Sequence, residues 1–104
     1  MAEDRIGLKL GSGNATAAAI TVIREYSGST ILQIRKSIQK DKYVLSRPYT
    51  DRHGLKSVIA CYEELERLGI KAEIYEMDNE PATIDFLKTL DATYDEISDE
   101  INST

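Results

Sequence analysis

The residues best suited to catalysis or metal binding are scarce, since the chain has one histidine, His53, and one cysteine, Cys61. A zinc site would have to complete its ligand set with carboxylates alone, and the same shortage limits a Cys-His nucleophile pair. His53 is predicted in the first turn of a helix with its side chain in solvent. Cys61 is predicted beside the apolar stripe of that helix, as a small packing residue. We expect no catalytic residue and no metal ligand.

The turn Gly11-Ser12-Gly13 separates a predicted strand from a predicted helix, which is a place where phosphate-binding turns occur. A dinucleotide fingerprint requires a third glycine, and a P-loop requires Gly-Lys followed by Ser or Thr. The residues that follow are instead Asn14, Ala15 and Thr16. We therefore expect this turn to bind no nucleotide, and we expect no cofactor elsewhere.

Clustered acidic residues are a further candidate for chemistry. They fall on predicted helices and lack the ligand spacing of an EF-hand loop, so we interpret them as solvated helix faces. These residues are Glu63, Glu64, Glu66, Asp95, Glu96, Asp99 and Glu100. With no better candidate, we predict that the chain is not an enzyme.

Charge is divided unevenly along the 104 residues, whose net charge is −5. Residues 1–75 carry twelve basic and nine acidic residues, whereas residues 76–104 carry one basic and nine acidic. The region 24–56 carries eight basic residues and three acidic ones, as a surface for RNA or for an acidic protein would. Its tyrosines, Tyr26, Tyr43 and Tyr49, lack the spacing of a base-stacking motif, so we do not expect nucleic acid as the partner.

Hydrophobic periodicity predicts one α+β domain, a length of 104 residues being enough for one core. Alternating apolar residues predict strands at 6–10 and 70–75, and Pro48 makes a strand at 42–49 an edge strand. Helical spacing predicts helices at 17–26, from Thr30 to about residue 40, and from Asp51 to Gly69. The expected order is β-α-α-β-α-β, with a three-stranded sheet covered by helices on one face.

The C-terminal part is predicted to be an acidic amphipathic helix, so we divide the chain into a core at 1–78 and a helix at 79–104. Pro81 suits the first turn of this helix, where its missing N–H costs nothing. An apolar seam at alternating spacings of three and four follows, about two heptads long. This seam either docks on its own domain or contacts another chain, which makes a homodimer one alternative. It comprises Leu87, Leu90, Tyr94, Ile97 and Ile101.

Nothing in the sequence indicates export or membrane insertion. No apolar run approaches the roughly 18 residues that cross a bilayer. The first five residues include the charged Glu3, Asp4 and Arg5 and no apolar segment follows them, and a lone cysteine is easiest to tolerate in a reducing compartment. We expect a cytoplasmic protein with no membrane contact.

The stretch from Arg5 to Met77 resembles the C-terminal domain of the bacterial large-subunit ribosomal stalk protein. The resemblance rests on the element order and on residues 17–28, which look like the first helix of that family and the glycine turn after it. Ile31, Arg35 and Gly69 also fall where the family keeps an apolar residue, a basic residue and a glycine. The Clp protease adaptor for N-degron substrates shares this fold, but its acidic pair after the first strand is replaced here by Gly11 and Ser12.

In the stalk family the first two helices and their turn recruit other proteins, so the resemblance implies a binding surface at Ile20, Arg24, Gly28 and Arg35. We therefore predict a non-enzymatic protein-protein interaction module, with the C-terminal helix as a second contact. The alternative is an immunity or antitoxin-type inhibitor whose acidic helix covers the basic site of a toxin.

Overall fold

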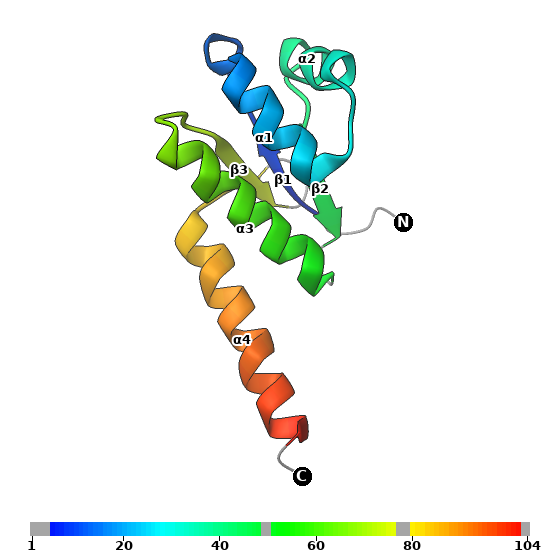
Figure 1. Ribbon diagram of the computed structural model, residues 1–104. Coiled ribbons are helices and arrows are strands. Elements are labelled where there is room, and N and C mark those ends of the chain that lie inside the picture. Colours follow the sequence, from blue (N-terminus) through cyan, green and yellow to red (C-terminus); the bar gives the residue numbers. More distant parts are fainter. Residues whose placement is uncertain (1–4, 49–50, 77–79, 103–104) are drawn as a thin grey trace.

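The computed structural model describes residues 5–48, 51–76 and 80–102, and for Ser12 and residues 94–102 it describes the backbone alone. Figure 1 shows a domain from which one long helix, α4, projects. The elements, in chain order, are β1 (Arg5–Lys9), the short 3₁₀ helix η1 (Ser12–Asn14), α1 (Ala17–Ser27), α2 (Ile31–Gln39), β2 (Leu45–Pro48), α3 (Arg52–Arg67), β3 (Glu73–Glu76), β4 (Glu80–Ala82) and α4 (Ile84–Asn102).

The strands form an antiparallel sheet in the order β2-β1-β3-β4. Leu8 at its centre is opposite Leu45 on one side and Ile74 on the other. The α+β class is confirmed, and β2 with Pro48 lies at an edge as predicted. The sheet has four strands where we predicted three.

The additional strand, β4, corrects the predicted start of the last helix. Pro81 does not begin that helix but lies in β4 opposite Tyr75. An edge strand tolerates proline because it has a neighbour on one side only. The helix begins after Thr83, whose hydroxyl accepts a hydrogen bond of 3.2 Å from the Phe86 N–H and so supplies the N-cap. Residues 80–82, predicted to belong to the helix, therefore extend the sheet.

Side-chain caps start three more of the described helices. The Thr16 hydroxyl accepts from the Ala19 N–H at the start of α1, and Asp51 accepts from the Gly54 N–H at the start of α3. Thr30 and Gln33 form a reciprocal capping box at the start of α2. Gly28 ends α1 with a φ of 71°, a left-handed conformation that glycine adopts without strain. These caps set where α1, α2 and α3 begin and where α1 ends.

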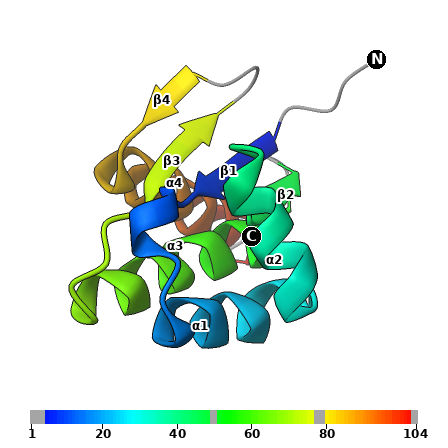
Figure 2. The ribbon, with the colours of Figure 1, turned by 90° about the horizontal axis from the view of Figure 1, so that it is seen from above.

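One core holds these elements together. Figure 2 shows α1 and α3 packed side by side beneath the sheet. The alternating residues of β1 and of the segment leading into β3 are buried against them, as predicted, at Ile6, Leu8, Leu10, Ile70, Ala72 and Ile74. Along the described helices, none combines the length and the apolar character that a membrane span requires.

Candidate protein-binding site

The α1–α2 face, which we define as Arg24, Gly28, Ile31, Leu32 and Arg35, is the surface that the structure builds where α1 turns into α2. The Gly28 N–H donates to the Arg24 carbonyl at 3.0 Å and closes α1. The capping box then starts α2 within three residues. This tight connection brings the end of α1 and the first turn of α2 onto one surface.

Two large apolar side chains of α2 lie in solvent on this face. Ile31 is 45% exposed and Leu32 is 64% exposed, whereas Ile34 and Ile38 are buried. By helical spacing Ile31 would share the apolar side of Ile34 and Ile38. It is exposed because it is the first residue of α2 and lies beyond the edge of the core.

Each of the two helices adds an exposed arginine to this face. Arg24 and Arg35 are both exposed, and within the part of the chain that the structure describes neither forms an ion pair. Residues 24–42 contain five basic and two acidic residues, so positive charge predominates.

Two shallow hollows adjoin the face and meet at Ser29. One, of about 370 Å³, is lined by Thr21, Arg24, Glu25, Gly28 and Ser29. The other, of about 330 Å³, is lined by Ser29, Gln33, Lys36, Ser37, Lys40 and Lys42. The second hollow is lined by three lysines, so it adds positive charge next to the turn.

Ile20 and Leu32 are the two residues of this region for which the sequence and the structure differ. Ile20 was predicted to contact a partner, but it is 3% exposed and belongs to the core. The resemblance placed it by helix position alone, without the direction of its side chain. Leu32 was not predicted as a site residue. The available signal was its position off the Ile31, Ile34 and Ile38 spacing, which leaves a leucine on the polar side of the helix.

The predicted seam of α4 is divided by the structure. Leu87 is fully buried in the core and Leu90 is partly buried against it, so these two residues bind their own domain. Tyr94, Ile97 and Ile101 fall where side chains lie outside the description, although the α4 backbone stays helical to Asn102. Figure 1 shows this distal part running away from the sheet and the other helices.

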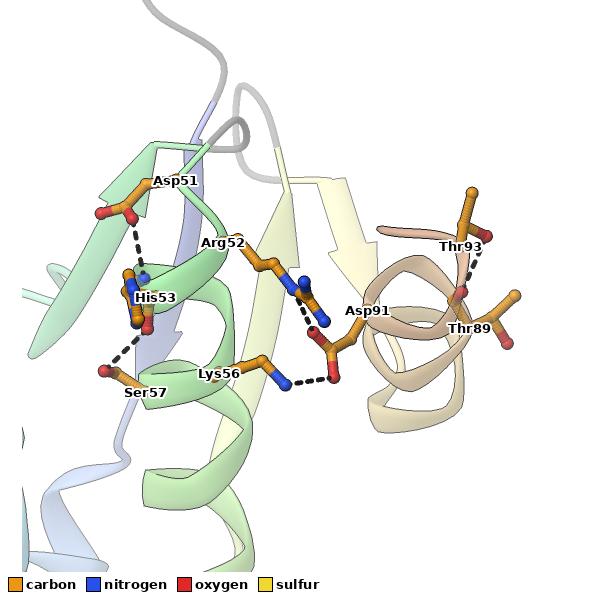
Figure 3. Close-up of polar contacts among 9 residues, drawn as sticks. Asp51, Arg52, His53, Lys56, Ser57, Thr89, Asp91 and Thr93 are labelled. Carbon is orange, nitrogen blue, oxygen red and sulfur yellow. Dashed lines mark hydrogen bonds and ion pairs between the residues drawn. The ribbon is translucent and has the colours of Figure 1, made fainter. Parts of the chain in front are cut away.

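Ion pairs connect the first two turns of α4, up to Asp91, to α3. Asp91 points from α4 between Arg52 and Lys56 of α3 (Figure 3), with nitrogen-oxygen distances of 3.7 Å and 3.2 Å. A turn earlier, Lys88 pairs with Glu63 at 3.1 Å. Together with Leu87, these contacts fix the direction in which α4 leaves the domain.

The side chains best suited to catalysis, those of His53 and Cys61, do not form a common site. His53 is exposed at the start of α3, where its carbonyl accepts a hydrogen bond from the Ser57 hydroxyl (Figure 3). Cys61 is buried, and burial raises the pKa of its thiol to about 12. A hydrogen bond to Glu64 and partial burial raise the pKa of Tyr26 to about 12. Both groups are therefore protonated at neutral pH. Among the described residues no cluster of His, Cys, Asp and Glu could hold a metal ion.

The sheet face opposite the helices is a second surface, built around Tyr43. The Lys9 ammonium lies 5.3 Å from the centre of the Tyr43 ring and 4.8 Å from that of Tyr75. It also pairs with Asp41 at 3.6 Å, and its side chain is only 12% exposed. Lys9 already contacts Asp41 and two tyrosine rings of its own molecule. Its charge is therefore less accessible to a partner than the charges of the α1–α2 face.

Comparison with known proteins adds no relative. No family model, curated protein or solved structure matches the chain. The resemblance to the ribosomal stalk domain therefore stays a prediction.

Proposed function

We propose that the chain is a non-enzymatic protein-binding module that contacts its partner through the α1–α2 face. The observation that carries this proposal is the exposure of Ile31 and Leu32 in a stretch that also exposes Arg24 and Arg35, two arginines with no ion-pair partner among the described residues. Large apolar side chains within a charged rim are typical of protein interfaces. The resemblance to the stalk domain supports the same surface.

The chemistry of the face specifies an acidic partner segment with apolar side chains. Full burial of a leucine or isoleucine stabilises by about 1.5–3 kcal/mol. Leu32 is 64% exposed and Ile31 is 45% exposed, so on binding Leu32 would contribute roughly 1–2 kcal/mol and Ile31 roughly 0.7–1.4 kcal/mol. Arg24 and Arg35 would contribute mainly to the association rate and to specificity.

The test is affinity capture from the cells that produce the protein, with paired charge-reversal variants. Arg24→Glu with Arg35→Glu should abolish retention of the partner, because the basic rim becomes acidic. The matched control is Arg67→Glu with Lys71→Glu, two exposed basic residues where α3 leads into β3. This control should retain the partner as the wild type does. A partner held equally by both double variants would refute the proposal.

A second candidate function is a toxin inhibitor that covers a basic site with α4. Its support is the projection of α4 together with four acidic and no basic residues in the segment 94–102. For this function, binding should survive reversal of Arg24 and Arg35. It should be lost when the acids of that segment are neutralised.

A further inference from the structure

The distal segment of α4, residues 94–102, matches the partner chemistry that the α1–α2 face requires. It is helical throughout. Its acids, Asp95, Glu96, Asp99 and Glu100, are accompanied by no basic residue. Tyr94, Ile97 and Ile101 recur at helical spacing, so the sequence places them along one side of the helix. The chain thus carries both a basic, apolar face and an acidic, apolar helix.

The two surfaces of one molecule cannot meet. Two contacts fix the first turns of α4: Leu87 is buried in the core, and Asp91 pairs with Lys56 of α3. Figure 1 shows α2 at the top of the molecule and the C-terminal end of α4 at the bottom, and the longest dimension of the molecule is 49 Å. The nine residues of the segment span about 14 Å at 1.5 Å per residue. The segment is therefore available only to another chain.

Electrostatics favours the α1–α2 face over a second α4 as the contact. Two such segments side by side would bring eight acids together with no basic residue. Like charges at short range repel in water, and opposite charges attract equally. The region 24–42 has five basic and two acidic residues, so most charge pairs between it and the acidic segment would attract.

We propose that residues 94–102 of one molecule dock on the α1–α2 face of a second copy. This proposal rests on the proposed function of that face. The contact is heterologous, so each molecule keeps one unoccupied face or one unoccupied segment, and association continues beyond the dimer unless a ring closes. A second copy and an external partner then compete for the same face.

The test is the mass of the full chain in solution, measured by sedimentation equilibrium from micromolar to millimolar concentration. At about 0.01 M salt, where the Debye length is about 30 Å, the average mass should rise with concentration. At about 1 M salt, where that length is about 3 Å, it should return to the mass of one chain. A wild type that stays monomeric at low salt overturns the proposal.

Complementation between two variants identifies the surfaces. The face variant carries Arg24→Glu with Arg35→Glu. The tail variant carries Asp95→Asn, Glu96→Gln, Asp99→Asn and Glu100→Gln. Each should be monomeric alone, and an equimolar mixture should form a one-to-one dimer, because one intact segment meets one intact face. Association of either variant by itself overturns the proposal, as does a mixture that stays monomeric.

The two proposals fail in different ways. If the face variant loses its captured partner while the wild type never self-associates, the function of the face stands and self-docking is wrong. If the mixture forms its dimer while the face variant keeps every captured protein, the face serves self-association and the proposed function is wrong. Circular dichroism melting of both variants shows whether they fold as the wild type does.

Discussion

Leu87→Ala tests whether α4 is anchored as the structure has it. Leu87 is 0% exposed, and the substitution removes three carbon atoms from the core. At about 0.8 kcal/mol per methylene the transfer term is about 2.4 kcal/mol, and the cavity left behind raises the cost further. Buried leucine-to-alanine changes cost about 2.7–5.0 kcal/mol in a well-studied series, so we expect about 3 kcal/mol here.

The loss of stability in Leu87→Ala should appear first as local unfolding of α4. The pairs Asp91–Lys56 and Lys88–Glu63 lie partly in solvent, with exposed fractions of 20–52%. Pairs of this kind contribute about 0–1 kcal/mol each, so they cannot hold the helix without Leu87. Amide hydrogen exchange in residues 84–93 should accelerate more than exchange in β1.

The assay is urea unfolding followed by circular dichroism, with Leu32→Ala as the matched control. Leu32 is 64% exposed, so the same substitution there should change the free energy of unfolding by less than about 0.5 kcal/mol. The reasoning is refuted if Leu87→Ala costs less than about 1 kcal/mol and leaves exchange in α4 unchanged. That result would mean that α4 does not dock through Leu87.

Three further substitutions or reactions test other parts of the fold. An alanine Cβ at Gly7 would lie 2.5–2.9 Å from ring atoms of Tyr43, so Gly7→Ala should cost about 1–3 kcal/mol in urea unfolding. Adding Tyr43→Ala removes the clash, and a double variant whose cost equals the sum of the single costs would contradict this contact. Gly28→Ala meets no atom within 4 Å but has a φ of 71°, so it should cost about 1–2 kcal/mol, against nearly zero for Gly13→Ala. Similar melting temperatures for these two variants would contradict the left-handed cap. Cys61 should react with iodoacetamide at pH 8 only after unfolding, because burial raises its pKa from 9.0 to about 12 in the folded chain. The raised pKa stabilises the fold below pH 9 and the contribution is lost as pH rises towards 12, so rapid alkylation of the native chain would argue against burial.

Local signals in the sequence predicted most of the elements. Each helix cap joins residues at most four positions apart, so it can be recognised in the sequence without the fold. The caps are the Thr30–Gln33 capping box, Asp51 and the glycine after α1. The alternation of Ile6, Leu8 and Leu10 likewise determined which side of β1 is buried, because successive side chains of a strand point to opposite faces.

The short strand β4 depended on tertiary structure. Three residues with a central proline carry little strand signal, and Pro81 is equally typical of a helix start. The strand exists because β3 has an unpaired edge that residues 80–82 can reach. The helix α4 therefore starts after the Thr83 cap and not at Pro81.

The candidate site shows the same division between local and tertiary information. The resemblance to the stalk domain nominated Arg24, Gly28 and Arg35, and the structure exposes all three. Whether a helical apolar residue lies in the core or in solvent depends on where its helix sits. Ile20 is consequently buried and Leu32 exposed, although both are apolar helix residues.

Contacts between distant segments were beyond the reach of the sequence. Asp91 pairs with Lys56, 35 residues earlier, and Lys9 lies over the rings of both Tyr43 and Tyr75. The sequence by itself determined the charges, the caps and the periodicity, because these act over one or two turns. Only the folded chain decided which charges meet, which apolar residues stay in solvent and where α4 points, because these depend on how the layers pack.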